Sequence, residues 1–515
     1  KYGKDAIQKI NGFFSFAFYD NVAGTVLIAR DRYGVKPLYY YKGDGYFCFG
    51  SELKALMLFQ IPRKINTAAI SMYMQLSYIP APFSFFNNVY KLRPGHFLTC
   101  HTINSSVEEI SYYSIPYPQR ESMPNEYLEA QKKLYDLVDK AVCRRLISDV
   151  PLGCFLSGGV DSSIISALAA QQVKSLNTYS IGFKDDKHFD ETHYAIQVAN
   201  KIKSHHTTFL LGVDDALDHL DSLLHYLDEP FGDSSALNMY MLSKETRKHV
   251  TVALSGDGAD ELFGGYNKHR AEFILRENPL IKLGLQFLAP VLEANIGSRD
   301  SKWGNKLRQL GRLAAAAKLN HRDRYWMMAC MADARFNGLK TDRTKVDDDI
   351  KFQWLKNLTP GGSLNEVLRT DLELVLQGDM LPKVDLMSMA NSLEVRTPFL
   401  DFTVVDYVSG LDSKWKINNR ERKKILKETF SHLVPEDLFN RPKQGFEVPL
   451  QRWLSTALKG RLNSLLDIDL IESQGIFKSG YVQSLRSQFE SAQPGNSAST
   501  IWCLMVLQSV VKRHL

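Results

Sequence analysis

Ser-Gly-Gly-Val-Asp-Ser-Ser, residues 157–163, is the stretch from which the fold is predicted. The apolar run 150–156 before it is typical of a buried strand, and the apolar run 164–168 after it is typical of a helix. A glycine turn between a strand and a helix lets backbone N–H groups approach an anion, and the helix N-terminus adds donors and partial positive charge. The stretch therefore predicts a phosphate-binding loop.

Asp161 lies inside this loop, and its acidic side chain cannot bind phosphate directly because both groups are negatively charged. A carboxylate beside a phosphate cradle suggests a Mg²⁺ ion that contacts both. Two common nucleotide motifs do not match: the Walker loop needs a Lys-Ser or Lys-Thr pair, and the dinucleotide motif needs differently spaced glycines. On this stretch alone, an ordinary loop with a helix cap remains an alternative.

Strands and helices alternate along residues 126–254. The predicted strands are 150–156, 177–183, 207–211 and 250–254, and the predicted helices begin at Asp161 and cover 191–202 and 215–226. This alternation predicts an α/β domain with a doubly wound parallel sheet, whose ligands bind beyond the carboxyl ends of the strands. The ends at Ser157, at 181–184 and at Ser255 should therefore face one cleft.

The first 115 residues have a different pattern. Short β-prone segments at 12–20, 25–30, 36–41 and 46–50, separated by Gly and Asn, predict an antiparallel meander. Helices are predicted at 51–56 and 66–75, and strands return over 97–113. Pro116, Pro118 and Pro124 mark a linker. We expect a first domain at 1–115, a linker at 116–125 and a second domain at 126–515, mainly helical from Ala271.

Composition excludes several classes of protein. The chain has 515 residues, 44% of them hydrophobic and 23% charged, which is ordinary for a globular protein of two or three domains. The net charge of +6 is mild and the basic residues are dispersed, so neither a nucleic-acid nor a membrane partner is expected. No apolar run approaches the roughly 20 residues of a membrane span. The six scattered cysteines favour thiols in a reducing compartment.

A second loop of the same kind follows the strand 250–254. Residues 255–266 read Ser-Gly-Asp-Gly-Ala-Asp-Glu-Leu-Phe-Gly-Gly-Tyr and contain three acidic side chains. Two Ser-Gly turns on neighbouring parallel strands, each with carboxylates, fit a cleft for a magnesium-bound nucleotide better than two unrelated helix caps do.

Together, the two loops resemble those of the ATP-pyrophosphatase domain of glutamine-dependent asparagine synthetases. Residues 384–401 resemble the family's signature stretch, and 441–446 resemble its late lysine loop. Residues 30–39 and 49–52 resemble the second half of its glutaminase domain. The resemblance implies a multidomain α/β and α+β protein. A partial αββα N-terminal-nucleophile-hydrolase domain would precede an ATP-pyrophosphatase domain similar to adenine nucleotide alpha hydrolases, with a helical C-terminal part.

The resemblance implies ATP, Mg²⁺, aspartate, and glutamine or ammonia as cofactors and substrates. In the family's reaction the aspartate carboxylate attacks the α-phosphate of ATP, which gives β-aspartyl-AMP and pyrophosphate, and ammonia then displaces AMP. Adenylation is required because the carboxylate oxygen must become a good leaving group. The protein must hold the nucleotide, neutralise pyrophosphate and exclude water. We expect a cytoplasmic enzyme, for which a homodimer is a candidate assembly.

The resemblance also assigns site residues. Leu156 and Ile181 are expected to contact adenosine at two strand ends. Asp161 and Asp260 are the expected Mg²⁺ ligands, with solvated loop acids as the alternative. The remaining nucleotide contacts are expected at Ser157, Gly158, Gly159, Ser162, Ser163, Ser255 and Gly256.

Further residues are expected near the reacting atoms. Lys443 is the candidate that stabilises charge on the α-phosphate. Asp257 stands where many family members carry Glu, a residue tied to formation of the intermediate, and its shorter side chain changes its reach. Glu394 and Arg396 either contact substrate or pair with each other. Chain position also places three acids near the cleft: Asp228, Glu229 and Asp233.

The glutaminase half has no candidate nucleophile in this chain. Family members use an amino-terminal Cys whose own α-amine is the base, whereas residue 1 is Lys here. We expect a parent protein with about 100 further amino-terminal residues. Nitrogen would then come from glutamine in that protein and from ammonia in this chain.

Two other functions remain open. β-Lactam synthetases and amidotransferases of surface-polysaccharide or secondary-metabolite pathways share this architecture and adenylate other acids. A nucleotide-binding scaffold without catalysis is the second alternative. Pyrophosphate release with a panel of acids separates the three.

Overall fold

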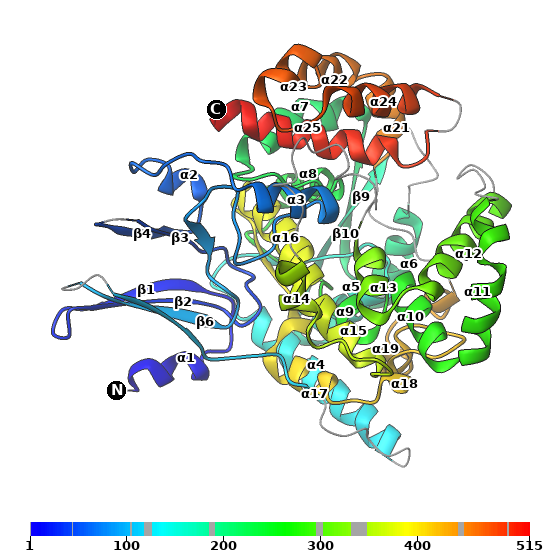
Figure 1. The fold of residues 1–515 in the computed structure, drawn as a ribbon. Helices are drawn as coiled ribbons and strands as arrows, with labels where there is room; N and C mark the ends of the chain where they lie inside the picture. Colours follow the sequence, from blue (N-terminus) through cyan, green and yellow to red (C-terminus); the bar gives the residue numbers. More distant parts are fainter. Residues whose placement is uncertain are drawn as a thin grey trace.

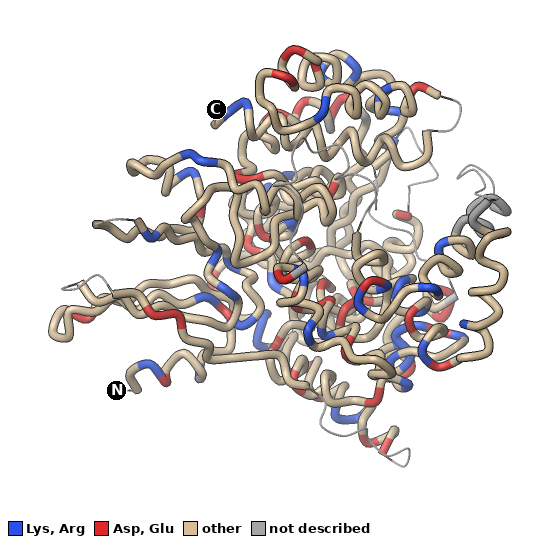
Figure 2. Tube along the Cα trace, viewed as in Figure 1, with Lys and Arg blue, Asp and Glu red and all other residues tan. Residues whose placement is uncertain are grey.

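The computed structural model describes residues 2–43, 45–102, 106–117, 126–184, 191–294, 302–330, 348–440, 448–491 and 494–514. An N-terminal part with two antiparallel sheets lies beside a larger part built on a parallel sheet (Figure 1). Lys, Arg, Asp and Glu alternate along the trace in both parts (Figure 2). The six cysteines, which all lie in these ranges, form no disulfide.

A five-stranded parallel sheet forms the centre of the larger part, in the order β10-β9-β8-β11-β12. Its strands are β8 (Leu152–Phe155), β9 (Asn177–Phe183), β10 (His205–Leu211), β11 (Val252–Leu254) and β12 (Glu394–Arg396). The four predicted strands are confirmed, whereas β12 was not predicted. The chain moves outward from β8 to β10 and then returns to β11 on the other side of β8. The strand order therefore reverses between β8 and β11, where ligands bind in open sheets of this kind.

Helices pack on both faces of this sheet. The helices of one face are α4 (Tyr127–Leu146), α5 (Val160–Gln172) and α6 (Thr192–Ile202), and those of the other are α7 (Val213–Tyr226) and α8 (Ser235–Arg247). Cys154 and Leu156 at β8 join the core of the first face, and Phe155 between them joins the core of the second. Because β8 is buried on both faces, it reads as a continuous apolar run rather than an alternating one.

The rest of the larger part is helical, as predicted. Its helices are α9 (Ala259–Phe263), α10 (Asn267–Glu277), α11 (Pro279–Ala294), α12 (Lys302–Lys318), α13 (His321–Ala329), α14 (Asp348–Leu355), α15 (Leu364–Asp371), α16 (Leu381–Met389), α17 (Phe402–Ser409), α18 (Ser413–Lys416), α19 (Lys424–Phe430), α20 (Asp437–Asn440), α21 (Leu450–Ser455), α22 (Lys459–Leu465), α23 (Ile468–Gln474), α24 (Ser479–Glu490) and α25 (Ser497–His514). A π-helical segment, Leu372–Met380, joins α15 to α16. Within the described ranges, every helix is too short or too polar to cross a bilayer.

The N-terminal part contains two antiparallel sheets rather than the single predicted meander. One sheet has the order β1-β2-β6-β7 and the other β4-β3-β5. The strands are β1 (Ser15–Asp20), β2 (Thr25–Arg30), β3 (Tyr39–Lys42), β4 (Phe47–Gly50), β5 (Val89–Lys91), β6 (His96–His101) and β7 (Val107–Ser111), with helices α1 (Ala6–Lys9), α2 (Leu53–Leu56) and α3 (Thr67–Leu76). Ile28, Leu38, Leu92 and Leu98 form the core between the sheets.

The crossing between the two sheets follows β2 and is held by two buried charged side chains. The Asp31 carboxylate accepts hydrogen bonds from the backbone N–H groups of Tyr33, Val35 and Lys36. The Arg30 guanidinium donates to the carbonyls of Lys36, Leu92 and Gly34 at 2.7–2.9 Å. These contacts fix a turn that separates β2 from β3, so the predicted antiparallel pairs β1–β2 and β3–β4 form but belong to two different sheets.

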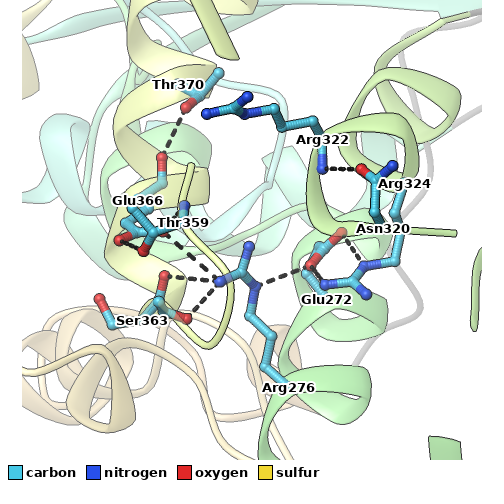
Figure 3. A network of polar contacts seen from close by, with 10 residues as sticks. Glu272, Arg276, Asn320, Arg322, Arg324, Thr359, Ser363, Glu366 and Thr370 are labelled. Atoms are coloured by element: carbon cyan, nitrogen blue, oxygen red, sulfur yellow. Dashed lines mark hydrogen bonds and ion pairs between the residues drawn. The ribbon is translucent and has the colours of Figure 1, made fainter. Parts of the chain in front are cut away.

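A buried ionic network ties the helical region together (Figure 3). Glu272 of α10 accepts two hydrogen bonds from Arg324 of α13, at 2.8 and 3.0 Å, and a third from Arg276 at 3.0 Å. Arg276 also donates to the carbonyl of Gly362, and Glu366 of α15 accepts from Thr359. The network therefore joins three helices through charges that water does not reach.

Arg324→Ala should destabilise the protein by about 3 kcal/mol, because it removes one partner of a buried, doubly hydrogen-bonded ion pair. Chemical denaturation measures the loss. Arg461→Ala is the matched control, since Arg461 pairs at the surface with Asp221 and should cost less than about 1 kcal/mol. Equal losses in the two variants would contradict this view of the network.

Candidate active site

The first glycine loop connects β8 to the N-terminus of α5. Its Gly158 has φ +69°, and a Cβ there would lie 2.5 Å from the Cβ of Tyr194 on α6, so only glycine fits. The hydroxyls of Ser157 and Ser162 lie 3.1 Å apart, and Ser157 also accepts from the N–H of Gly159. Gly159, which precedes the helix, has no side chain to cap α5. The loop thus places hydroxyls and the start of a 13-residue helix at the edge of the sheet.

The second glycine loop connects β11 to α9. The N–H of Ser255 donates to the carbonyl of Arg396 at 2.9 Å, so the unpredicted strand β12 fixes the start of this loop. The Ser255 hydroxyl donates to Asp257 at 2.7 Å. Gly258 has φ +90°, and a Cβ there would lie 2.6 Å from Leu400. Backbone and core packing therefore dictate the path of the loop.

The two loops touch where the strand order reverses. A Cβ on Gly256 would lie 2.6 Å from the backbone nitrogen of Ser162 and 2.7 Å from the carbonyl carbon of Asp161. Together they border a cavity of about 410 Å³, which Ser157, Gly159, Ser255 and the end of β9 also line. The sequence prediction that three strand ends face one cleft is confirmed.

Part of the lining of this cavity is apolar. It includes Leu156 and Ile181 at or near the ends of two strands, as well as Phe183, Met239 and Leu242. The N–H of Leu156 donates to the carbonyl of Tyr179 at 2.8 Å, which completes the pairing of β8 with β9. A flat aromatic base of a nucleotide fits such residues, whereas its phosphates fit the glycine loops.

The two predicted metal ligands face each other across a lysine. The Nζ of Lys423 lies 2.5 Å from Asp161 Oδ2 and 2.5 Å from Asp260 Oδ1. Burial alone would lower the pKa of Lys423, but the two carboxylates raise it above its usual range. All three side chains line the cavity. Both carboxylates thus contact the ammonium of Lys423.

This arrangement fits Mg²⁺, whose preferred ligands in proteins are carboxylate oxygens and which shares its sphere with substrate phosphates. Among the described residues, no group of three or more His, Cys, Asp and Glu side chains could bind a metal. A pair of carboxylates such as Asp161 and Asp260 therefore requires phosphate or water oxygens to complete the coordination.

A second buried lysine lines the cavity near Asp257. Lys383 of α16 donates to Asp233 at 2.9 Å. Burial would lower the pKa of Lys383, but Asp233 and Asp379 raise it. Burial also raises the pKa of Asp257, while the hydrogen bond from Ser255 and the charge of Lys383 lower it in part. The positive charge of Lys383 thus lowers the pKa of Asp257, whereas the charges of Asp161 and Asp260 raise it.

Glu261 is another acid of the cavity wall. Burial and, to a lesser degree, the charge of Asp260 raise the pKa of Glu261 to about 7, although the hydrogen bond from Tyr266 opposes both effects. The Tyr266 hydroxyl donates this bond at 2.7 Å.

Some residues predicted for the site lie elsewhere. Arg396 donates to Glu394 at 2.7 Å and to the carbonyls of Arg145 and Ile147 at the end of α4, and neither Glu394 nor Arg396 lines the cavity that the described residues form. Arg396 instead caps the carboxyl end of a helix.

Asp228 accepts a hydrogen bond from the N–H of Leu53, and Glu229 pairs with Lys91. Both acids, which were expected near the cleft, thus contact the N-terminal part, and neither lines the cavity that the described residues form. Their position in the sequence suggested the cleft, but the residues that follow α7 pack against the N-terminal part instead. Lys443 lies outside the described residues.

Lys423 and Lys383 were missed by the sequence analysis. Lys423 belongs to the charged run 420–424, which resembles a solvated surface segment, and Lys383 directly precedes the signature stretch. The sequence offered no signal for Lys423, and the only signal for Lys383 was its position next to the signature stretch.

Comparison with known proteins decides the family. The asparagine synthase family pattern matches residues 133–512, and the glutamine amidotransferase domain pattern matches residues 1–113. The chain belongs to the asparagine synthase family. It is 30% identical to asparagine synthetase [glutamine-hydrolyzing] 1 of Bacillus subtilis over 536 residues, which cover 100% of this chain and 80% of that protein.

Two other members of the family are similar over shorter spans. A putative asparagine synthetase of Mycobacterium bovis is 31% identical over 463 residues, covering 88% of this chain and 69% of that protein. A putative asparagine synthetase of Methanocaldococcus jannaschii is 38% identical over 284 residues, which cover 53% of this chain and 54% of that protein.

Proposed function

We propose that this asparagine synthase family member makes asparagine from aspartate, with ATP as the activating substrate and nitrogen from glutamine or ammonia. The cavity between the glycine loops binds ATP, and the reaction passes through β-aspartyl-AMP with release of pyrophosphate. The observation that carries the proposal is the pair Asp161 and Asp260, which two loops of different strands bring around one cation.

The chain's own residues supply binding and orientation. Leu156 and Ile181 contact the adenosine, while the hydroxyls of Ser157 and Ser162 and the N-terminus of α5 hold the pyrophosphate oxygens. When bound between Asp161 and Asp260, Mg²⁺ supplies positive charge to the departing pyrophosphate. Ser163 and Gly158 were expected to contact the nucleotide, but both are buried and neither lines the cavity that the described residues form, so we propose that they support the loop from within.

Asp257 and Lys383 extend the site toward the acid substrate. Their charges lie on the cavity wall, where Lys383 can attract a carboxylate and Asp257 can accept a hydrogen bond from an ammonium group. Aspartate carries both groups. The substrate roles of Glu394 and Arg396 remain proposals, and their contacts in this structure favour the structural alternative.

We propose the domain division 1–115, 116–125 and 126–515, with an N-terminal-nucleophile-hydrolase fold before the linker and an adenine nucleotide alpha hydrolase-like fold after it. The antiparallel sheets and the parallel sheet support these two assignments. A cytoplasmic location and a homodimer remain predictions from the sequence.

Pyrophosphate release with ATP, Mg²⁺, ammonia and a panel of acids tests this function. Aspartate should give pyrophosphate, AMP and asparagine in equal amounts. A preference for another acid would contradict aspartate as substrate, and no pyrophosphate with any acid would favour a scaffold.

Lys443→Ala should retain ATP binding and lose pyrophosphate formation, because we propose that its ammonium stabilises charge on the α-phosphate only in the transition state. Nucleotide affinity and single-turnover pyrophosphate release measure the two effects separately. Undiminished turnover would refute this role for Lys443.

A further inference from the structure

Lys423 occupies the position that the proposed function gives to a metal ion. Its Nζ lies 2.5 Å from an oxygen of Asp161 and 2.5 Å from an oxygen of Asp260, and the residue is only 7% exposed. An ammonium at this point and a divalent cation shared by the same two oxygens exclude each other. The contact of Lys423 with the two carboxylates therefore determines under which conditions a metal ion can bind there.

The backbone around Lys423 directs the side chain to this position. Lys423 has φ +56° and immediately precedes α19, and this left-handed conformation is unusual for a residue other than glycine. A residue in this conformation carries backbone strain, which the surrounding contacts must offset. The ion pairs with Asp161 and Asp260 are among these contacts.

Gly265 leaves the space through which the lysine reaches the pair. A Cβ at Gly265 would collide with the carboxylate of Asp260 and with the Cε atom of Lys423. The N–H of Gly265 donates to the carbonyl of Asp260 at 2.8 Å, which closes the turn after α9. The lysine and the turn thus pack directly against each other.

Asp161 and Asp260 are partly buried, and removing the ammonium without a replacement would take away the cation that contacts both of them, which is unfavourable. A divalent ion alone is a poor replacement for the ammonium, because two carboxylates supply too few oxygens to complete the coordination of Mg²⁺. A nucleotide triphosphate supplies the missing oxygens and, at the same time, a new anionic partner for the displaced ammonium.

We propose that the Lys423 ammonium excludes divalent metal from the Asp161–Asp260 pair until a nucleotide binds. Metal and nucleotide then bind with positive coupling, and the empty protein keeps its two acids neutralised without metal. This inference rests on the proposed nucleotide site but goes beyond it, since it concerns the protein before ATP arrives.

Mn²⁺ binding to the full chain, followed by electron paramagnetic resonance, tests the proposal without any turnover. Wild type should bind Mn²⁺ weakly alone and roughly 5- to 150-fold more tightly with an α,β-methylene ATP analogue, the usual range of coupling between sites. Lys423→Met should bind Mn²⁺ more tightly than wild type does in the absence of nucleotide. Its melting temperature should rise with Mn²⁺ alone, whereas that of wild type should not.

Three variants control the measurement. Lys424→Met removes the neighbouring lysine, whose Nζ lies 4.8 Å from the centre of the Tyr127 ring instead, and should behave as wild type. Lys423→Arg keeps the charge and should still exclude Mn²⁺. The double variant Asp161→Asn with Lys423→Met should lose the tight binding, which places the metal at the pair.

Equal Mn²⁺ affinity of wild type and Lys423→Met without nucleotide would overturn the proposal, as would tight binding that survives Asp161→Asn. The proposed function is tested apart from this. If wild type releases pyrophosphate with aspartate while the Mn²⁺ affinities are equal, only the role of Lys423 is wrong. If wild type releases none, the function itself fails.

Discussion

Gly256→Ala should lower kcat/KM for ATP-dependent pyrophosphate release by at least about a hundredfold. The added methyl carbon would lie 2.6 Å from the backbone nitrogen of Ser162, 2.7 Å from the carbonyl carbon of Asp161 and 2.8 Å from its Cβ. These atoms belong to the loop itself and cannot rotate away, so the two loops must separate. A displacement of about 1 Å at the reacting centre can cost about 10²-fold in rate.

A matched glycine distinguishes this effect from a general response to substitution. Gly460 lies in α22 and an alanine there would meet no atom within 4 Å. Gly460→Ala should leave turnover unchanged and stabilise the protein by about 0.5–1 kcal/mol, because alanine favours the helix. If Gly256→Ala is as active as Gly460→Ala, the close approach of the two loops has no role in catalysis.

Asp260→Asn should reduce kcat for pyrophosphate release by about 10²- to 10³-fold, the usual effect of removing one preorganised electrostatic contact. The change keeps the size of the side chain but removes the negative charge of one of the two carboxylates that Lys423 contacts. Lys423 retains its contact with Asp161, so the melting temperature should change little. Steady-state kinetics over a range of Mg²⁺ concentrations measures the loss and should show a raised Mg²⁺ requirement.

Asp221→Asn is the control for this substitution. Asp221 pairs with Arg461 at 2.6 Å but is 75% exposed, so the pair contributes little and turnover should not change. A Mg²⁺ requirement in Asp260→Asn equal to that of the control would contradict the assignment of Asp260 as a metal ligand.

The strands that end at the cavity could be predicted from sequence because each has a strong local signal. Parallel strands buried on both faces read as apolar runs, and the glycine turns after 150–156 and 250–254 mark their carboxyl ends. The meeting of the two loops then followed from the parallel topology, in which successive strand ends share one edge.

The features that were missed depend on contacts distant in sequence. β12 has only three residues and forms because β11 is already in place beside it. Lys423 contacts Asp161, which is 262 residues away along the chain, through a left-handed backbone conformation that the run 420–424 does not reveal. Asp228 and Glu229 contact the N-terminal part because Leu53 and Lys91 supply their partners.

Transfer of ¹⁸O from labelled aspartate to AMP tests the central claim most directly. If the cavity joins the aspartate side-chain carboxylate to the α-phosphate, ammonia must leave one carboxylate oxygen on AMP. Mass spectrometry should then find one ¹⁸O in each AMP and none in pyrophosphate. Label in inorganic phosphate together with ADP, or unlabelled AMP with full formation of asparagine, would contradict the account.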